Sequence, residues 1–356
     1  MRRITRIKRS GARFGIRSGV RLAAALALTC AATSSFAAPG WCESGKTVKL
    51  AQITWESGAL MTEMVRTVLE KGYGCKTEVI PGATAATETA LTKNDLQVWA
   101  EHWTGRSPIV ARALKEGSVK LVGELVPGGD KEGWYVPDYV INGDAKRGIK
   151  PIAPQLRSIS QLPQYKSLFA DDEEPGKGRF YNCPAGWDCE RFNNRLLSAY
   201  KLGDDYTNFR PGTGGALDAA IASAYERGKP ILFYYWQPAG LMAKYRFVQL
   251  QGAPYSDACW NTITDPKGTP CASAFKVSHL KIAVSTPFYD AEPAAVAFFE
   301  KVSLPLSLDE QLVQQMHDKK LDAATVARSF FEQHPEIWKQ WVTPDVAARV
   351  QAGLHT

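Results

Sequence analysis

The sequence predicts an α/β protein of two lobes, each a mostly parallel sheet flanked by helices, with a ligand in the cleft between the lobes. Segments with strand and helix patterns alternate twice along the chain, over residues 48–103 and again over 159–238. Tryptophans close several predicted strands, at the end where α/β sheets bind ligands. The 356 residues are enough for two medium-sized cores.

Residues 1–37 have the pattern of a secretory signal peptide. Eight basic side chains and no acidic one occur in residues 1–21, and a short apolar run, 22–32, follows them. Ser35-Phe36-Ala37 fits the small-x-small cleavage rule, so we expect cleavage after Ala37. Cleavage removes eight positive charges from a formal net charge of +7, which leaves the mature chain near −1. That charge gives no basis for nucleic-acid binding, and we expect none.

Six of the seven cysteines follow the signal peptide, which in an exported chain indicates disulfides. Six cysteines allow 15 pairings. Closeness in sequence favours Cys183–Cys189 and Cys259–Cys271, which leaves Cys42–Cys75. The remaining Cys30 would mark a lipoprotein and Arg2-Arg3 a twin-arginine signal, as alternatives to a simple export signal. We expect no metal site, because the cysteine spacings fit no zinc motif and the histidines are scattered.

The first α/β unit begins with a strand of alternating, β-branched residues and a helix with apolar side chains at helical spacing. A second strand, a short helix and a third strand follow. The five predicted elements are residues 48–55, 56–74, 75–83, 86–95 and 96–103.

An extended crossing segment, 133–143, leads to the second unit. That unit contains a helix-like stretch, a polar loop, a helix, a Gly-rich turn with an amphipathic helix, and a buried strand, which are residues 159–169, 171–179, 190–204, 207–230 and 231–238. Another strand, 279–288, precedes a mostly helical tail. We therefore assign residues 38–140 and 253–356 to lobe 1, and residues 141–252 to lobe 2.

Three tryptophans, Trp103, Trp187 and Trp236, are the candidate ligand site. Trp103 and Trp236 close predicted strands, and Trp187 lies in the short loop between Cys183 and Cys189. Core packing is the alternative use of each ring. Aromatic faces that meet attract a cation without hydrogen-bond donors, typically a quaternary ammonium, with ~2 kcal/mol per desolvated contact. The disulfide loop would hold Trp187 in a fixed pose and so reduce the entropy lost on binding.

The motif CPAGWDC at 183–189, followed by GKPILFYYWQP at 228–238, resembles the periplasmic glycine betaine/proline betaine-binding proteins of ABC transporters. The likeness extends to segments 53–74 and 95–105. It implies a periplasmic location, the two-lobed periplasmic-binding-protein fold (type II-like), a quaternary amine ligand and a membrane permease as partner. In that family three tryptophans enclose the trimethylammonium group and main-chain amides of the cysteine loop bind the carboxylate. These positions fall on Trp103, Trp187 and Trp236, and on Asp188 and Cys189.

The chain departs from the family pattern on the carboxylate side. A histidine of close relatives falls at about Ser107, so Ser107, Arg106 or His102 would have to replace it. Asp188 stands where relatives have glycine, and an acid there favours a ligand with a protonated amine or without a carboxylate. An amino acid such as proline or histidine, or another amine, is therefore the alternative ligand.

Two further features bear on function. The turn Trp55-Glu56-Ser57 precedes a predicted helix, where free backbone N–H groups suit a carboxylate; helix capping by Ser57 is the alternative. The chain has neither GxSxG nor HExxH, and its histidines lack triad-like neighbours. We therefore predict a monomeric binding protein without a cofactor, not an enzyme, although a receptor partner in sensing would use the same cleft.

Overall fold

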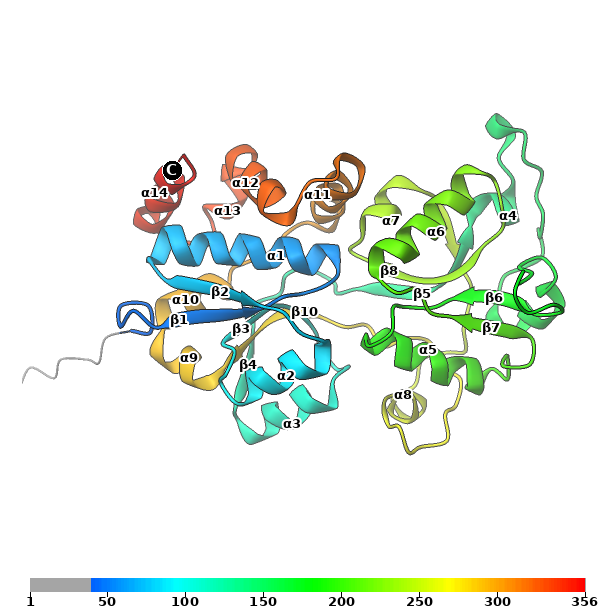
Figure 1. Ribbon diagram of the computed structural model, residues 1–356, viewed down its shortest axis with the longest axis horizontal. Helices are drawn as coiled ribbons and strands as arrows, with labels where there is room; N and C mark the ends of the chain where they lie inside the picture. The colour runs from blue at the N-terminus through cyan, green and yellow to red at the C-terminus, as the bar shows by residue number, and fades with distance from the viewer. Residues whose placement is uncertain (1–39, 356) are drawn as a thin grey trace, which may run out of the picture. The chain divides into compact units, whose positions relative to one another are not determined.

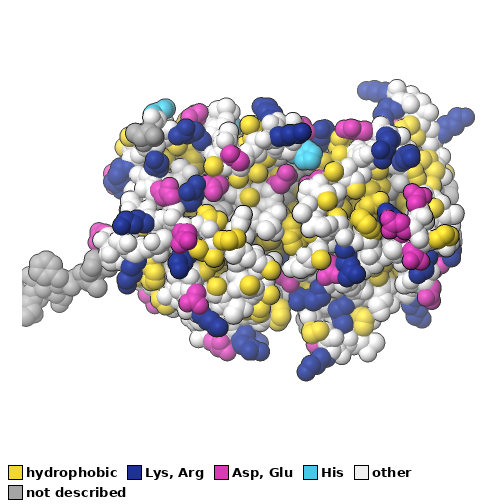
Figure 2. All heavy atoms as spheres, in the orientation of Figure 1, with side chains coloured by type: hydrophobic (Ala, Val, Ile, Leu, Met, Phe, Trp, Pro, Cys, Tyr) yellow, Lys and Arg dark blue, Asp and Glu magenta, His cyan; other side chains and the backbone are white. Residues whose placement is uncertain are grey.

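The computed structural model describes residues 40–355, so the predicted signal peptide and its cleavage site lie outside the described residues. Two five-stranded sheets form the described part, each flanked by helices (Figure 1). Acidic and basic side chains are interspersed over the face shown in Figure 2. No described helix combines the length and apolar character needed to cross a bilayer. The predicted two-lobed α/β architecture is confirmed.

The first sheet has the strand order β2-β1-β3-β10-β4. Its strands are β1 (Thr47–Ala51), β2 (Lys76–Ile80), β3 (Val98–Trp103), β4 (Val119–Val122) and β10 (Leu280–Ser285). β1 pairs in parallel with β2 and β3, whereas β10 is antiparallel to β3 and β4. All strands except β10 therefore run the same way. Every residue of β3 is buried, as expected for a strand in the middle of a sheet covered on both faces.

Helices cover both faces of this sheet (Figure 1). The helices are α1 (Glu56–Thr67), α2 (Thr84–Thr92), α3 (Pro108–Glu116), α9 (Thr286–Ala291), α10 (Pro293–Phe299), α11 (Leu306–Lys319), α12 (Ala323–Gln333), α13 (Pro335–Trp338) and α14 (Pro344–Gly353). α1 continues as a π-helical turn to Gly72 and packs against β3 and α12. Its Leu60, Met64 and Val68 are fully buried, which agrees with their helical spacing in the sequence.

The second sheet repeats the pattern with the order β7-β6-β8-β5-β9. Its strands are β5 (Lys131–Pro137), β6 (Gly178–Tyr181), β7 (Tyr206–Phe209), β8 (Leu232–Gln237) and β9 (Phe247–Gln249), and its helices are α4 (Asp138–Asn142), α5 (Asp188–Ala199), α6 (Gly214–Glu226), α7 (Gly240–Lys244) and α8 (Asp257–Thr264). β5 is the one strand that runs against the others. The helix expected at 159–169 is a 3₁₀ helix, Ile159–Tyr165, with Pro163 inside it.

The chain crosses between the lobes earlier than the sequence suggested and returns later. β5 falls within residues 38–140, which we assigned to lobe 1, yet it pairs with β8 and β9 in the second sheet. The crossing precedes it at Gly128 and Gly129, whose positive φ angles of 92° and 76° suit glycine. α8 lies within 253–356 but packs against α5 of the second lobe. We therefore propose lobe 1 as residues 40–130 and 279–355, and lobe 2 as 131–278.

The six described cysteines form three disulfides with the pairing that the sequence favoured. Cys42–Cys75 links the segment before β1 to the start of β2. Cys183–Cys189 closes the loop between β6 and α5, and Cys259–Cys271 ties α8 to the segment after it. Of the three, the second closes the shortest loop, and that loop contains Trp187.

Candidate ligand-binding site

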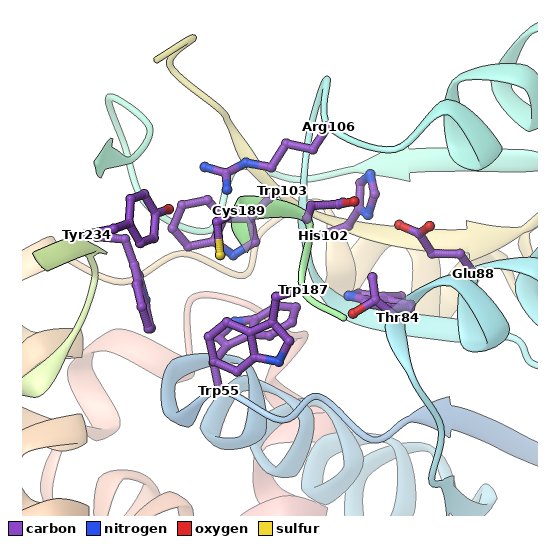
Figure 3. Close-up of a pocket in the computed structure, with 12 residues that line it drawn as sticks. Trp55, Thr84, Glu88, His102, Trp103, Arg106, Trp187, Cys189 and Tyr234 are labelled. Carbon is purple, nitrogen blue, oxygen red and sulfur yellow. The ribbon is translucent and has the colours of Figure 1, made fainter. Parts of the chain in front are cut away.

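A pocket between the lobes is lined by aromatic side chains from both of them (Figure 3). Its empty volume, which includes space open to solvent, is about 500 Å³. The aromatic lining consists of Trp55, Trp99, Trp103, Trp187, Tyr234 and Trp236. The three tryptophans predicted from the sequence therefore meet at one pocket, together with two that the prediction had not grouped with them.

The tryptophans of lobe 1 are fixed by hydrogen bonds to one buried carboxyl group. The indole N–H groups of Trp55 and Trp103 both donate to Glu101 Oε1, at 2.6 and 3.0 Å. The hydroxyl of Ser57 donates to the same oxygen at 3.0 Å. Glu101 and Trp103, two residues apart on β3, point to the same side, as their hydrogen bond shows, while the pairing of β3 with β10 shifts register between Trp99 and His102. Burial raises the pKa of Glu101 to about 7.

The tryptophans of lobe 2 are held by packing and by the disulfide loop. Trp187 immediately precedes α5, and its ring centroid lies 5.5 Å from that of Trp236 and 5.7 Å from that of Trp55. Its indole N–H donates to Thr54 Oγ1 at 3.1 Å, so this ring contacts lobe 1 directly. Trp236, near the end of β8, stacks on Tyr235 with centroids 4.5 Å apart. The rings of Trp187 and Trp236 cross at 70°, so that the edge of one ring meets the face of the other.

Asp188 and Cys189 also line the pocket, at the start of α5. The first backbone N–H groups of a helix have no partner within it and favour an anion. No side chain caps this helix, although Asp188 brings a negative charge to the same turn. The Asp188 carboxylate is paired with Arg191 Nη2 at 2.9 Å.

Three residues were candidates to bind a carboxylate of the ligand in place of the family's histidine. Each of them is either bonded to another protein group or neutral. Ser107 does not line the pocket; it caps α3 and donates its hydroxyl to Glu88 Oε2 at 2.6 Å. His102 lines the pocket, but burial lowers its pKa to about 4, so its ring is neutral at pH 7. Arg106 bonds to Asp130, Glu132 and Ser278, with its guanidinium carbon 4.4 Å from the centre of the Trp103 ring.

Glu56 and Ser57 lie beside the main pocket and line a smaller hollow that adjoins it. Ser57 does not cap α1, because its hydroxyl is used by Glu101. Glu56 lies near Asp218 of α6 and His317 of α11, with one possible ligand atom from each within 4.8 Å of the others. Burial, and then the charge of Asp218, raise the pKa of Glu56 to about 7. The fold thus brings one of the scattered histidines into an interlobe cluster that the sequence did not reveal.

Glu88 and Glu101 were not predicted from the sequence. Glu101 carried a visible signal, because an acid lies two residues from a tryptophan on either side in a strand that is buried throughout. Glu88 carried none, since it lies in a short helix rich in alanine and threonine.

Comparison with known proteins decides the family. Residues 46–333 match the family described as the substrate-binding domain of ABC-type glycine betaine transport systems, OpuAC. The chain belongs to this family. It is a family of solute-binding proteins of transporters, not of enzymes.

Individual relatives agree with this assignment. The glycine betaine/proline betaine-binding periplasmic protein of Escherichia coli is 28% identical over 338 residues, covering 90% of this chain and 96% of the relative. The trimethylamine N-oxide-binding protein of Pelagibacter ubique is 24% identical over 300 residues, covering 83% and 90%. Both relatives extend over most of the OpuAC match.

Solved structures show the same fold. A choline-binding protein of an ABC transporter, in complex with choline, superposes with a TM-score of 0.66 at 20% identity, covering 88% of this chain and 99% of that one. Lactococcal OpuAC in its closed form with glycine betaine gives a TM-score of 0.63 at 17% identity, covering 84% and 100%. The periplasmic-binding-protein fold that the sequence resemblance implied is confirmed.

Proposed function

We propose that this protein captures a quaternary ammonium compound, such as glycine betaine, proline betaine or choline, and delivers it to the permease of an ABC transporter. One observation carries the proposal: Trp55, Trp103, Trp187 and Trp236, drawn from both lobes, line a single pocket. Aromatic faces attract a cation that cannot donate hydrogen bonds, by ~2 kcal/mol per ring once water is excluded. Four such rings would suit a trimethylammonium group.

Membership of the OpuAC family supports the transport role and a permease partner. The E. coli relative is described as periplasmic, and residues 1–37 have an export-signal pattern, so the mature chain is a periplasmic monomer in this proposal. Binding closes the two lobes on the ligand, since Trp187 of lobe 2 donates across the pocket to Thr54 of lobe 1. A radius of gyration that stays constant on adding saturating ligand, in small-angle scattering, would argue against closure.

The first test is a calorimetric titration of residues 38–356 with glycine betaine, proline betaine, choline, carnitine, proline and histidine. Micromolar or tighter binding of a quaternary amine is the expected result. Binding of proline or histidine alone would keep the transport role and replace the ligand class, with Asp188 as the residue that redirects the site. Binding of none of these compounds would reject the proposal.

A matched pair of variants tests whether the pocket is the binding site. Trp187→Ala removes the ring that contacts both Trp55 and Trp236, so affinity for the quaternary amine should fall more than 30-fold, the equivalent of about 2 kcal/mol. Trp41→Ala removes a ring that packs on Phe288, away from the pocket, and should leave affinity unchanged. Equal effects of the two substitutions would place the ligand elsewhere.

A further inference from the structure

Glu88 presents an acidic oxygen to the pocket that nothing in the protein uses. The side chain comes from α2 and is only 3% exposed, yet it lines the pocket. Its Oε2 accepts the hydroxyl of Ser107 at 2.6 Å, while Oε1 has no partner among the described residues. Figure 3 shows Glu88 on the side of the pocket opposite Tyr234. Because Oε1 is unbonded on a residue that lines the pocket, it is free to accept a hydrogen bond from a donor group of a ligand.

The group that pairs with Glu88 does not come from a cation of the pocket wall. Among the described residues that line the pocket, Arg106 is the one cation besides His102, and it is held by Asp130 and Glu132. Arg191 does not line the pocket and is paired with Asp188, although its charge lowers the pKa of Glu88. His102 is neutral, because burial lowers its pKa to about 4. Among the described residues that line the pocket, the polar wall around Glu88 thus offers acceptors and neutral groups, and its charged side chains are already paired. A ligand carboxylate that approached Glu88 would meet a like charge.

The geometry assigns Glu88 as the residue that determines ligand specificity. It selects a quaternary ammonium ion whose second polar group donates a hydrogen bond, as a hydroxyl does, over one that carries a carboxylate. The tryptophans hold the cationic head, and the free Oε1 accepts from the hydroxyl, which gives a charge-assisted hydrogen bond. This inference rests on the proposed function, since it concerns the second end of the same ligand.

One feature of the site opposes this preference. The first backbone N–H groups of α5, at Asp188 and Cys189, attract a carboxylate through their unpaired donors. Asp188 weakens that attraction, because its own carboxylate lies in the same turn. Burial raises the pKa of Glu88 to about 7; the charge of Asp188 also raises it, whereas the hydrogen bond from Ser107 and the charge of Arg191 lower it. The ligand with a net positive charge relieves this repulsion, whereas a zwitterion adds a third carboxylate.

Choline and glycine betaine form a matched pair of probes, because they share the trimethylammonium group and differ in hydroxyl against carboxylate. Calorimetric titrations at pH 8, where Glu88 is largely ionised, should show tighter binding of choline by the unmodified protein. In Glu88→Gln the amide oxygen can still accept from Ser107, but the charge is lost. Choline should then bind about tenfold more weakly, and glycine betaine equally well or more tightly.

Glu78→Gln is the matched control, since Glu78 is an exposed acid of lobe 1 on β2, outside the pocket. It removes the same charge from the same lobe and should leave the choline-to-betaine ratio unchanged. Thermal unfolding of all three proteins checks that each is folded.

If the ratio of choline affinity to glycine betaine affinity is the same in Glu88→Gln as in the unmodified protein, the inference is overturned. Tighter binding of glycine betaine than of choline by the unmodified protein would also overturn it. Either result would leave the proposed function intact, because a quaternary amine would still bind. Failure of both compounds to bind the unmodified protein would instead reject the proposed function itself.

Discussion

The two lobes hold their tryptophans at the pocket by different physical means. In lobe 1, Trp55 and Trp103 are oriented by hydrogen bonds to a single oxygen of Glu101, which is 1% exposed. In lobe 2, Trp187 lies in a loop closed by a disulfide, and Trp236 is stacked on Tyr235. Similar rings in one pocket are thus positioned by electrostatics on one side and by a covalent link and packing on the other. The two halves should therefore respond differently to substitution.

The largest expected effect comes from substituting Glu101, the shared hydrogen-bond acceptor of lobe 1. Glu101→Ala leaves the Trp55, Trp103 and Ser57 donors without their acceptor, and each unsatisfied buried group costs ~1–3 kcal/mol. We expect a fall of at least several degrees in the unfolding temperature and at least tenfold weaker ligand binding, measured by circular dichroism and calorimetry. Glu101→Gln keeps an oxygen acceptor and should retain most of the affinity. Equal losses in both variants would show that the hydrogen bonds to Oε1 do not position the rings.

The next largest effect compares two disulfides of lobe 2, one at the pocket and one away from it, by their influence on ligand binding. Replacing Cys183 and Cys189 by serine, or Cys259 and Cys271 by serine, should each lower the free energy of unfolding by roughly 2–3 kcal/mol, as loops of this length predict. Only the first pair should also weaken binding, by about three- to tenfold, because Trp187 then loses freedom when the ligand binds. Chemical denaturation and titration of both variants give the two quantities. If binding is weakened equally by both, the loop does not preorganise Trp187.

A smaller effect concerns the dependence of stability on pH, to which Glu101 contributes. Burial raises the pKa of Glu101 to about 7, from a usual value of 4.5. Between those two pH values the folded chain keeps a proton that the unfolded chain has lost, so stability increases as pH falls from 8 to 5. One such group changes the free energy of unfolding by up to about 1.4 kcal/mol per pH unit. The unfolding temperature of Glu101→Gln should therefore depend less on pH over this range, and an unchanged pH dependence would exclude Glu101 as its source.

Most of the fold could be predicted from the sequence, because alternating strand and helix patterns are local features of the chain. The sequence did not show β6 and β7, of four residues each, which fall in stretches that we took for a polar loop and a Gly-rich turn. Their parallel pairing with each other and with β8 depends on residues far apart in the chain, which no local pattern reports. β5 was taken for a crossing segment for the same reason, since its partners β8 and β9 lie about 100 residues later.

In the candidate site, too, features that depend on local sequence could be predicted, and features that depend on contacts between distant segments could not. Trp103, Trp187 and Trp236 could be predicted because strand ends and a short cysteine loop are visible in the sequence. The polar groups that surround them could not. Glu88 reaches the pocket only through the packing of α2, and its contact with Ser107 joins two helices. The cluster of Glu56, Asp218 and His317 joins α1, α6 and α11 from both lobes.

The smallest effect tests whether the start of α1 belongs to the ligand site. Ser57→Ala removes one of three donors to Glu101 and leaves both indole N–H groups in place. Stability should fall by about 0.5–1.5 kcal/mol, and affinity should change less than twofold. Ser256→Ala is the matched control, because Ser256 caps α8 by accepting from the Cys259 N–H, and its loss costs ~1 kcal/mol of stability without touching the pocket. A loss of affinity in Ser57→Ala well beyond that in the control, at similar stability, would mean that the Ser57 hydroxyl, through its hydrogen bond to Glu101, helps to position the tryptophans of lobe 1 for the ligand.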